Sequence, residues 1–183
     1  ISELREICKE NDILFIIDEI QTGFSRTGSI FAYQQYGFSP DIMVVAKSLG
    51  GGMPIGAIIS TNEICSAFTP GTHGSTFGGN AAACAAGIAV IKYLQEKDLA
   101  KSAELLGNYL CEELAKLGEK YKIIKEIRGM GLMVALEFNE PMAAELMKNA
   151  LSEGIVLNKI SEYTIRLLPP LVINKKDINN LRD

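Results

Sequence analysis

The sequence predicts an α/β fold with a mostly parallel sheet, followed by a smaller α+β unit. Three observations lead to this class. Apolar runs of strand length alternate with helical patterns in the first half of the chain, which is typical of a parallel sheet. The stretch EKDLAKSAELLGNYLCEELAKLG then predicts one long, charged amphipathic helix. Short strand patterns separated by glycine turns follow this helix, as in an α+β unit.

The first half opens with an amphipathic helical pattern in ISELREICKE. The continuous apolar run ILFIIDEI comes next and predicts a strand buried on both faces, ending at Asp18 and Glu19. After a loop with glycines and a short helical turn in FAYQQYG, the runs DIMVVAK and PIGAIIS predict two further strands. Ligands of parallel sheets gather beyond the carboxyl ends of the strands, which is where we expect Asp18 and Lys47.

A loop of glycines and hydroxyl residues, TPGTHGSTFGGN, precedes a helix of small residues in AAACAAGIAVIKYL. We place a domain boundary in the charged helix that follows, near residues 97–105. The chain then divides into residues 1–100, the incomplete carboxyl-terminal part of a large domain, and residues 101–183, a small domain truncated at its end.

The small domain begins with the charged helix and continues as a hairpin around Gly129–Gly131. A helix near residues 140–153 and short strands at GIVLNK and TIRLLP follow. Asp177 is expected to cap a last helix.

Composition excludes several classes of protein. The 18 basic residues against 22 acidic ones give a net charge of -4, without a basic stripe that would follow a nucleic-acid backbone. No apolar stretch approaches the length of a membrane span, and the amino-terminal pattern is not a signal peptide. The four cysteines are scattered and only one histidine accompanies them, which argues against a metal site and a disulfide framework. We expect a soluble cytoplasmic protein that binds neither nucleic acid nor membrane.

The stretch AKSLGGG raises a chemical question, because it puts Lys47 at a strand end directly before three glycines. A desolvated lysine loses its proton more easily, since burial disfavours the charged form, and then attacks carbonyl groups. The glycines leave room for a flat ligand over the backbone. A carboxylate on the neighbouring strand end, Asp18, is suited to hold a positive charge on that ligand. Together these features indicate pyridoxal phosphate chemistry.

Four collinear motifs extend this interpretation. The stretches IIDEIQTGFSRTG, PDIMVVAKSLGGGMPIGA, TPGTHGSTFGGN and EIRGMGLMVALEF together resemble the class III, ornithine aminotransferase-like family of pyridoxal-phosphate-dependent aminotransferases, which has fold type I. The resemblance covers the whole chain in order, and the wording is nearest to the acetylornithine branch. It implies pyridoxal 5′-phosphate as cofactor, and amino acids and 2-oxo acids as substrates.

The resemblance also implies roles for individual residues. Lys47 would bind the cofactor covalently and move the proton during catalysis. Asp18 would pair with the pyridine nitrogen, and Gln21 would hydrogen-bond the phenolic oxygen. Thr76, with Ser75 beside it, would reach the cofactor phosphate of the partner subunit in a homodimer. Arg166 would bind the substrate α-carboxylate with its planar fork, and we expect this substrate-binding role alongside the catalytic role of Lys47.

Each residue has a structural alternative. Lys47 taken alone is interpreted as a lysine at a strand end whose side chain reaches out so that its ammonium group stays in water. Asp18 and Glu19 could end a strand or cap the next turn, and we give Glu19 no catalytic role. Ser75 and Thr76 could bond their own backbone, and Arg166 could serve a structural ion pair.

Three further residues are given no catalytic role. We expect Arg128 to stabilise the hairpin, and we assign no chemistry to His73. Where the family usually has proline after GGN, this chain has Ala81.

The resemblance further implies that full-length relatives are roughly twice this long. The absent amino-terminal half would carry the turn that cradles the cofactor phosphate, an aromatic residue that stacks on the ring, and part of the substrate pocket. We therefore expect the 183-residue chain alone to be at best a feeble aminotransferase.

Several functions remain open. The first is transfer of the amino group of N-acetylornithine, or a related ω-amine, to 2-oxoglutarate in arginine and ornithine metabolism. Ornithine or 4-aminobutyrate aminotransferase, a semialdehyde aminomutase and an inactive remnant are alternatives. A nucleotide-binding loop around Lys47 is disfavoured because Ala46 and Asp41 occupy the two positions where such a loop needs glycine.

Overall fold

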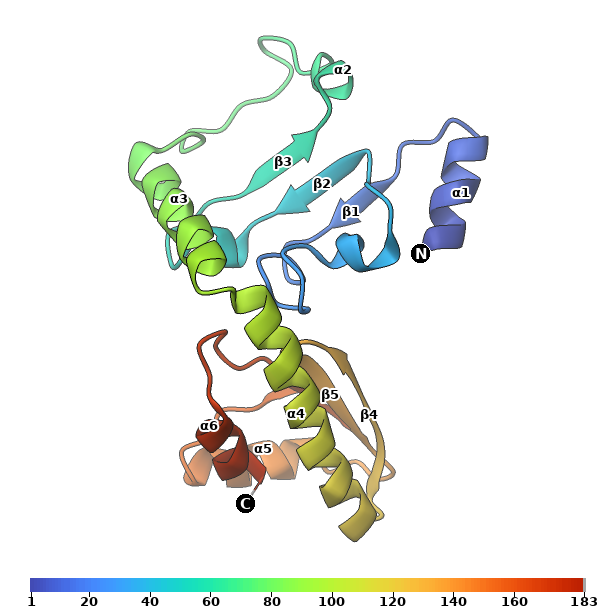
Figure 1. Cartoon of the computed structure of the whole chain (residues 1–183), viewed down its shortest axis with the longest axis vertical. Coiled ribbons are helices and arrows are strands. Elements are labelled where there is room, and N and C mark those ends of the chain that lie inside the picture. Colours follow the sequence, from blue (N-terminus) through green and yellow to red (C-terminus); the bar gives the residue numbers. More distant parts are fainter. Residues whose placement is uncertain (183) are drawn as a thin grey trace. The chain divides into compact units, whose positions relative to one another are not determined.

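The computed structural model describes residues 1–182 and forms two compact units (Figure 1). The first unit comprises Ile1–Ser25 and Ser29–Asp98, and the second comprises Arg26–Gly28 and Leu99–Asp183. The division after Asp98 lies inside the expected boundary region, and three residues from the first half of the chain pack with the second unit. The interpretation of the units as parts of a large and a small domain stays a prediction.

The first unit is built on a three-stranded sheet in the order β1-β2-β3, with β1 at Ile16–Asp18, β2 at Ile42–Val45 and β3 at Ala57–Ser60. The α/β class is confirmed, but the sheet of this unit is mixed, because β1 and β2 are parallel and β2 and β3 are antiparallel. The reason is the connection between β2 and β3. A parallel pairing needs a crossover, usually a helix, whereas residues 46–56 contain only the short 3₁₀ turn η2 (Lys47–Gly50) and turn straight back.

The helical elements of the first unit are short except for the last. They are α1 (Ser2–Glu10), the 3₁₀ helix η1 (Ala32–Tyr36), α2 (Asn62–Cys65) and α3 (Ala81–Glu96). The helix α3 packs on η2, where a Cβ atom at Gly87 would lie 3.4 Å from the Leu49 carbonyl oxygen. Asn80 caps α3 by accepting a hydrogen bond from the Ala83 amide at 3.1 Å, so the helix starts cleanly at Ala81 without the family's proline.

The prediction of a strand buried on both faces is wrong for β1 in the described chain. Ile16 is 58% exposed, and Leu14 just before it is 53% exposed. Ile58 of β3 is exposed to a similar degree. An apolar run reports the chemistry of the side chains, but burial requires a covering layer, and no helix of residues 1–182 packs extensively on β1 or β3.

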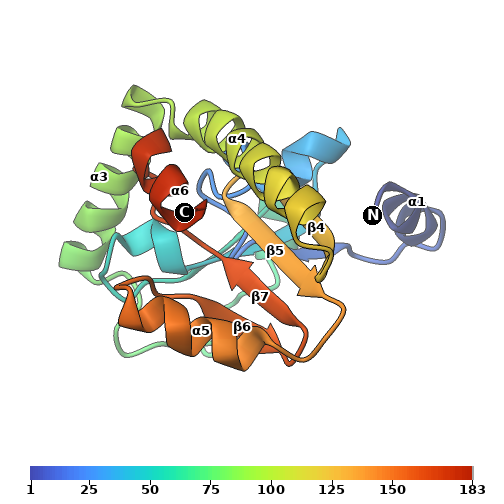
Figure 2. The same ribbon diagram turned by 90° about the horizontal axis from the view of Figure 1, so that it is seen from below.

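The second unit is an antiparallel four-stranded sheet in the order β4-β5-β7-β6, with helices packed on it (Figure 2). The expected hairpin is confirmed by the pairing of β4 with β5, and the expected helix by α5. The bounds of these elements are α4 Leu99–Lys120, β4 Ile124–Met130, β5 Met133–Phe138, α5 Ala143–Ser152, β6 Asn158–Ser161, β7 Thr164–Leu167 and α6 Lys175–Arg182.

The core of the second unit lies between the sheet and its helices. In β5, alternate residues are buried, which is the pattern of a strand with one face on a core. Helix α4 packs on β4 and β5, α6 packs beside α4, and α5 packs on β6 and β7. The buried cluster consists of Leu110, Leu114, Val134, Leu136, Phe138, Ala143, Ile165, Leu167 and Ile178.

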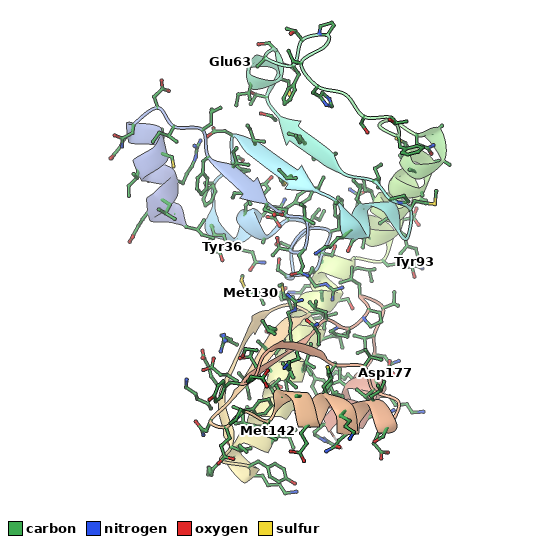
Figure 3. All side chains as sticks on the ribbon, turned by 180° about the vertical axis from the view of Figure 1, so that it is seen from behind. Tyr36, Glu63, Tyr93, Met130, Met142 and Asp177 are labelled. Carbon is green, nitrogen blue, oxygen red and sulfur yellow. The ribbon has the colours of Figure 1, made fainter. Side chains whose placement is uncertain are left out.

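Two polar arrangements fix α6. Glu113 of α4 is buried and accepts hydrogen bonds from Lys116 at 2.5 Å and from Arg182 of α6 at 2.7 Å. At the start of α6, Asn174 accepts from the Asp177 amide at 3.1 Å, and the Asp177 carboxylate accepts from the Asn174 amide at 3.2 Å. This reciprocal capping box makes Asn174 the cap and Asp177, labelled in Figure 3, its partner one turn into the helix. The expectation that Asp177 itself caps the helix is therefore wrong.

Candidate active site

Asp18 and Lys47 stand at the same edge of the first sheet. Asp18 is the last residue of β1 and pairs with Val44 of the parallel strand β2, and Lys47 follows the end of β2 after Ala46. Because parallel strands end at one edge, the two side chains belong to one end of the sheet. Both are exposed in the described chain, so the desolvation of Lys47 that the sequence suggested is absent here.

The backbone at Lys47 is strained. Its φ angle is +44°, a region that residues with a Cβ atom seldom occupy. Strain of this kind persists only where the surrounding structure imposes it, and it concentrates at functional sites.

The glycines after Lys47 have packing roles of their own. A Cβ atom at Gly50 would lie 2.8 Å from Ile55, and one at Gly51 would lie 2.7 Å from Val90 of α3. Only Gly52 has open space around it, with a φ angle of +111°. Two of the three glycines therefore allow η2 to fold against its neighbours, which differs from the expected role of leaving room for a ligand.

Hydrogen bonds in the turn after β1 hold the acidic residues of the first motif, Asp18 and Glu19, in place. Asp18 accepts a hydrogen bond from the Ile20 amide at 2.8 Å. Glu19 is fully buried, and its carboxylate accepts from the Thr22 hydroxyl at 2.5 Å and from the Tyr33 amide at 2.9 Å. Gln21 lies in the same turn and is half-buried. The structure therefore agrees with a structural role for Glu19, which holds the turn that carries Asp18 and Gln21.

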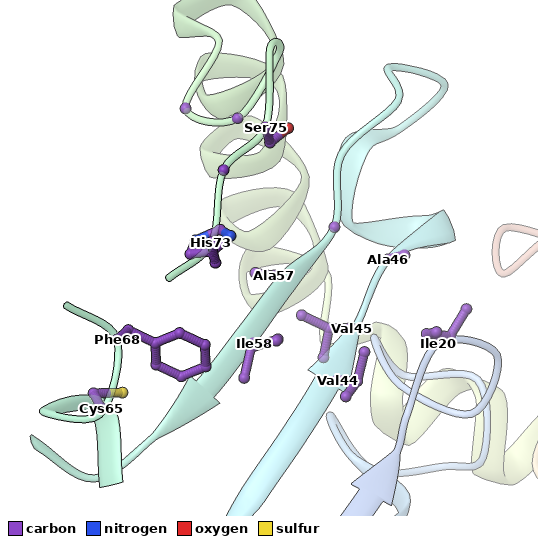
Figure 4. A pocket seen from close by; sticks show the side chains of 14 residues that line it. Ile20, Val44, Val45, Ala46, Ala57, Ile58, Cys65, Phe68, His73 and Ser75 are labelled. Carbon is purple, nitrogen blue, oxygen red and sulfur yellow. The ribbon is translucent and has the colours of Figure 1, made fainter. Parts of the chain in front are cut away.

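An open hollow of about 900 Å³ lies next to this edge within the first unit. Figure 4 shows His73 and Ser75 on the loop along one part of its wall, with the end of β2 and the start of β3 opposite. His73 packs edge-on against Phe68, with ring centroids 5.7 Å apart, so its position has a local cause. The lining also includes Ile20, Val44, Val45, Ala46, Gly56, Ala57, Ile58, Cys65, Gly74, Gly78 and Gly79.

The loop hydroxyls are exposed and available. Ser75 lines the hollow, and Thr76 follows it without lining the hollow itself. Within residues 1–182 neither hydroxyl has a hydrogen-bond partner, which differs from the alternative in which they bond their own backbone. Two unpaired hydroxyls beside glycines suit an anionic group such as a phosphate.

Arg166 belongs to the second unit, on β7 between β5 and β6. Its Nε and Nη2 atoms donate to the Asn158 side-chain oxygen at 3.2 and 2.9 Å, so the fork is held by an amide. Arg128 bonds Glu126 and Glu137 at 2.8 and 2.7 Å along the hairpin, which agrees with its expected hairpin role.

No role was assigned from the sequence to the last residues of the first motif, FSRTG. Phe24 and Ser25 both have positive φ angles, and within residues 1–182 the buried Ser25 hydroxyl has no hydrogen-bond partner. Arg26 donates to two carbonyl groups of the second unit. The arginine in FSRTG could have indicated a role, because it stands between a polar turn and a glycine within a motif. The motif was interpreted only for the residues that would bind the cofactor.

The class III aminotransferase family model matches residues 1–183, so the chain belongs to that family. Acetylornithine aminotransferase of Caldanaerobacter subterraneus subsp. tengcongensis is 47% identical over 179 residues, covering 98% of this chain and 45% of that protein. Ornithine aminotransferase of Oceanobacillus iheyensis is 43% identical over 180 residues, covering 98% of this chain and 44% of that protein.

Solved structures agree with this assignment. Acetylornithine aminotransferase from Elizabethkingia anophelis superposes with a TM-score of 0.94 at 38% identity, covering 99% of this chain and 49% of that one. An S-selective transaminase from an Arthrobacter species, with alanine bound, superposes with a TM-score of 0.95 at 28% identity, covering 100% and 45%. The chain thus spans about half the length of the proteins it matches, and the expected fold and family are confirmed.

Proposed function

We propose that the whole protein is a pyridoxal-phosphate-dependent aminotransferase that transfers the amino group of N-acetylornithine, or of a related ω-amine, to 2-oxoglutarate in arginine and ornithine metabolism. The observation that carries this proposal is the position of Lys47 and Asp18 at one edge of parallel strands, in a chain of the class III family. Four curated relatives named acetylornithine aminotransferase, at 42–47% identity, support the choice of donor.

The residues present fit the cofactor by their chemistry. Lys47 offers an exposed primary amine for the cofactor aldehyde, and Asp18 offers a carboxylate for the pyridinium nitrogen. Gln21 offers an amide for the phenolic oxygen, and the unpaired hydroxyls of Ser75 and Thr76 offer donors for the phosphate. When bound, pyridoxal 5′-phosphate withdraws electrons from the substrate carbon that carries the amino group.

Proton movement is the task of this chain's own residues. Once its Nζ atom is free, Lys47 acts as the general base that removes the proton from the substrate carbon and returns it during transfer. Asp18 keeps the neighbouring positive charge in place, since an opposite charge within a few ångströms favours the charged form. Arg166 orients the substrate by a two-point contact with its α-carboxylate.

Ornithine is the second candidate donor. It is favoured by the 43% identity to an ornithine aminotransferase and by solved ornithine aminotransferases among the structural neighbours. The distinguishing measurement is the steady-state kcat/KM of the whole protein for N-acetylornithine, ornithine and 4-aminobutyrate with 2-oxoglutarate as acceptor. A preference for 4-aminobutyrate would contradict both candidates.

We also propose that the whole protein is a cytoplasmic homodimer. Residues 1–182 contain no helix with the length and hydropathy that a membrane crossing needs. The exposed, unpaired hydroxyls of Ser75 and Thr76 are compatible with a phosphate contact to a second subunit. Light scattering that finds the active protein as a monomer would contradict this role.

The experiment that tests the cofactor lysine uses the whole protein loaded with pyridoxal phosphate. After borohydride reduction, peptide mass spectrometry should find the cofactor on the peptide of Lys47, and Lys47→Ala should abolish both this label and transamination. Lys92→Ala, an exposed lysine of α3, is the matched control and should keep both. Labelling that survives in Lys47→Ala would refute the assignment.

A further inference from the structure

The segment Arg26–Gly28 belongs to the second unit, although it lies in the first half of the chain. Its contacts there are close. A Cβ atom at Gly131, in the turn of the β4–β5 hairpin, would lie 2.6 Å from the Gly28 amide nitrogen and 2.7 Å from the Arg26 carbonyl oxygen. Gly28 in turn lies against Glu104 of α4, where its own Cβ atom would be 3.2 Å from the Glu104 Cβ. The segment is therefore seated between α4 and the hairpin.

Arg26 makes three hydrogen bonds from this seat. Its Nη1 atom donates to the Leu132 carbonyl at 3.1 Å and to the Pro169 carbonyl at 2.6 Å. Its own backbone carbonyl accepts from the Leu132 amide at 3.0 Å. Arg26 thus connects the residue before β5 with the segment that follows β7.

These bonds lie where the ladder between β5 and β7 stops. Val134 pairs with Leu167, so two residues further along each strand Leu132 would face Pro169. Proline has no amide hydrogen, and the ladder cannot continue through it. The Arg26 guanidinium replaces the missing rung by bridging the two carbonyl groups, and the Arg26 carbonyl occupies the amide of Leu132.

The charge of Arg26 has no carboxylate partner among residues 1–182. The side chain is half-buried, and this burial lowers the pKa of the guanidinium, which nevertheless stays charged at neutral pH. A half-buried charge satisfied only by carbonyl groups costs desolvation energy, whereas an apolar side chain of similar size would fill the same space without that cost. The three hydrogen bonds of Arg26 instead suit a role in positioning the chain at this end of the sheet.

We propose that Arg26 is a positioning residue for Arg166. Arg166 lies on β7 one residue before Leu167 and three before Pro169, whose carbonyl Arg26 holds. By fixing the carboxyl end of β7, Arg26 keeps the backbone of Arg166 in register with β5, where Arg166 pairs with Ala135. The inference rests on the proposed function, in which Arg166 binds the α-carboxylate of the substrate.

The test uses the whole protein with pyridoxal phosphate and compares Arg26→Met, Arg26→Lys, Arg166→Met and the double variant Arg26→Met/Arg166→Met. Arg128→Met, an exposed arginine of the same unit, is the matched control. The KM for 2-oxoglutarate, kcat, borohydride labelling of Lys47 and hydrogen exchange of a peptide spanning residues 164–170 are measured for each.

Arg26→Met should raise the KM for 2-oxoglutarate about tenfold, because a displaced Arg166 makes a weaker charged hydrogen bond to the substrate carboxylate. It should leave kcat and Lys47 labelling near the wild-type values and speed exchange at 164–170. Arg26→Lys, which keeps the charge but has a single donor centre, should fall between, and Arg128→Met should match the wild type. Because Arg26 acts through Arg166, the double variant should be no worse than Arg166→Met alone.

A wild-type KM in Arg26→Met, or a double variant in which the two effects multiply, would overturn the inference. If Arg166→Met leaves KM unchanged while Lys47 is still labelled, the carboxylate role of Arg166 fails and the inference falls with it, but the aminotransferase proposal stands. If Lys47 is never labelled, the proposed function fails by itself. Faster hydrogen exchange at residues 164–170 in Arg26→Met would then still support the proposal that Arg26 fixes the carboxyl end of β7.

Discussion

At the scale of single residues, Lys47 combines a chemical and a conformational peculiarity. Its φ angle of +44° belongs to a region that costs a residue with a Cβ atom about 1–2 kcal/mol. Glycine would occupy the same region without that cost, yet the chain has lysine there. A position that keeps a costly residue is expected to need its side chain, which agrees with the proposed role of the Lys47 amine.

Because Lys47 has a positive φ angle and Lys92 lies in a helix, glycine and alanine should differ in stability in opposite directions at these two positions. Lys47→Gly should be more stable than Lys47→Ala by about 1 kcal/mol, because only glycine relaxes at positive φ. At Lys92, in the helix α3, Lys92→Gly should instead be less stable than Lys92→Ala by about 1 kcal/mol. Chemical denaturation of the four variants measures the differences. Equal stabilities for the two Lys47 variants would mean that the strain at this position is absent.

At the scale of elements, the close approach of α4 to the β4–β5 turn organises the second unit. Gly107 of α4 lies so near this turn that a Cβ atom there would be 2.0 Å from the Gly131 carbonyl oxygen. The backbone of the turn cannot yield easily, because Gly131 is itself in contact with the segment Arg26–Gly28. Helix, turn and segment therefore form one closely packed stack.

Gly107→Ala should accordingly destabilise the protein by about 3 kcal/mol through overpacking. Gly118→Ala is the matched control in the same helix, since its new Cβ atom would lie 3.8 Å from Ile124, in ordinary contact. This control should gain about 0.5–1 kcal/mol, because alanine favours a helix more than glycine does. Thermal and urea unfolding measure both changes, and a neutral Gly107→Ala would contradict the packing of α4 on the turn.

At the scale of the whole molecule, both units contain carboxylates whose charged form the fold stabilises. The Lys116 ammonium and then Arg182 hold the pKa of the buried Glu113 below its usual value. The Phe15 amide and then Arg5 do the same for the pKa of Asp41 in the first unit. A group whose pKa is lower in the folded state contributes stability above its unfolded pKa, and this contribution is lost as the pH falls through the folded pKa.

Stability should therefore be constant near neutral pH and should decline once the pH falls below 4.5, the ordinary value for Glu113. Thermal melts between pH 7 and pH 3 measure this slope. Glu113→Gln should lower the melting temperature at pH 7 and flatten the decline, because it has no proton to take up. Glu119→Gln, on the exposed face of the same helix, should keep the wild-type slope. Parallel curves for Glu113→Gln and wild type would exclude Glu113 as a source of the acid dependence.

Much of this arrangement was predictable from local chemistry. The hairpin at Gly131, the small-residue helix after Asn80 and the position of Lys47 after its strand all follow from turn residues and periodicity, which act over a few neighbours. The antiparallel β3 was missed because direction depends on the connection and not on the strand pattern. The bonds of Arg26 to Leu132 and Pro169 could not be predicted, since no local rule relates residues so far apart.

The seat of Arg26–Gly28 in the second unit also has a consequence for how the chain folds. Arg26 is separated from Leu132 by 106 positions and from Pro169 by 143. Contacts between residues so distant in the chain slow folding, because a long loop must close before they form. During synthesis this segment leaves the ribosome before Leu132 and Pro169, so its hydrogen bonds to them form only after both have been made. The last step in assembling the second unit is thus expected to be the capture of a stretch of chain made long before it.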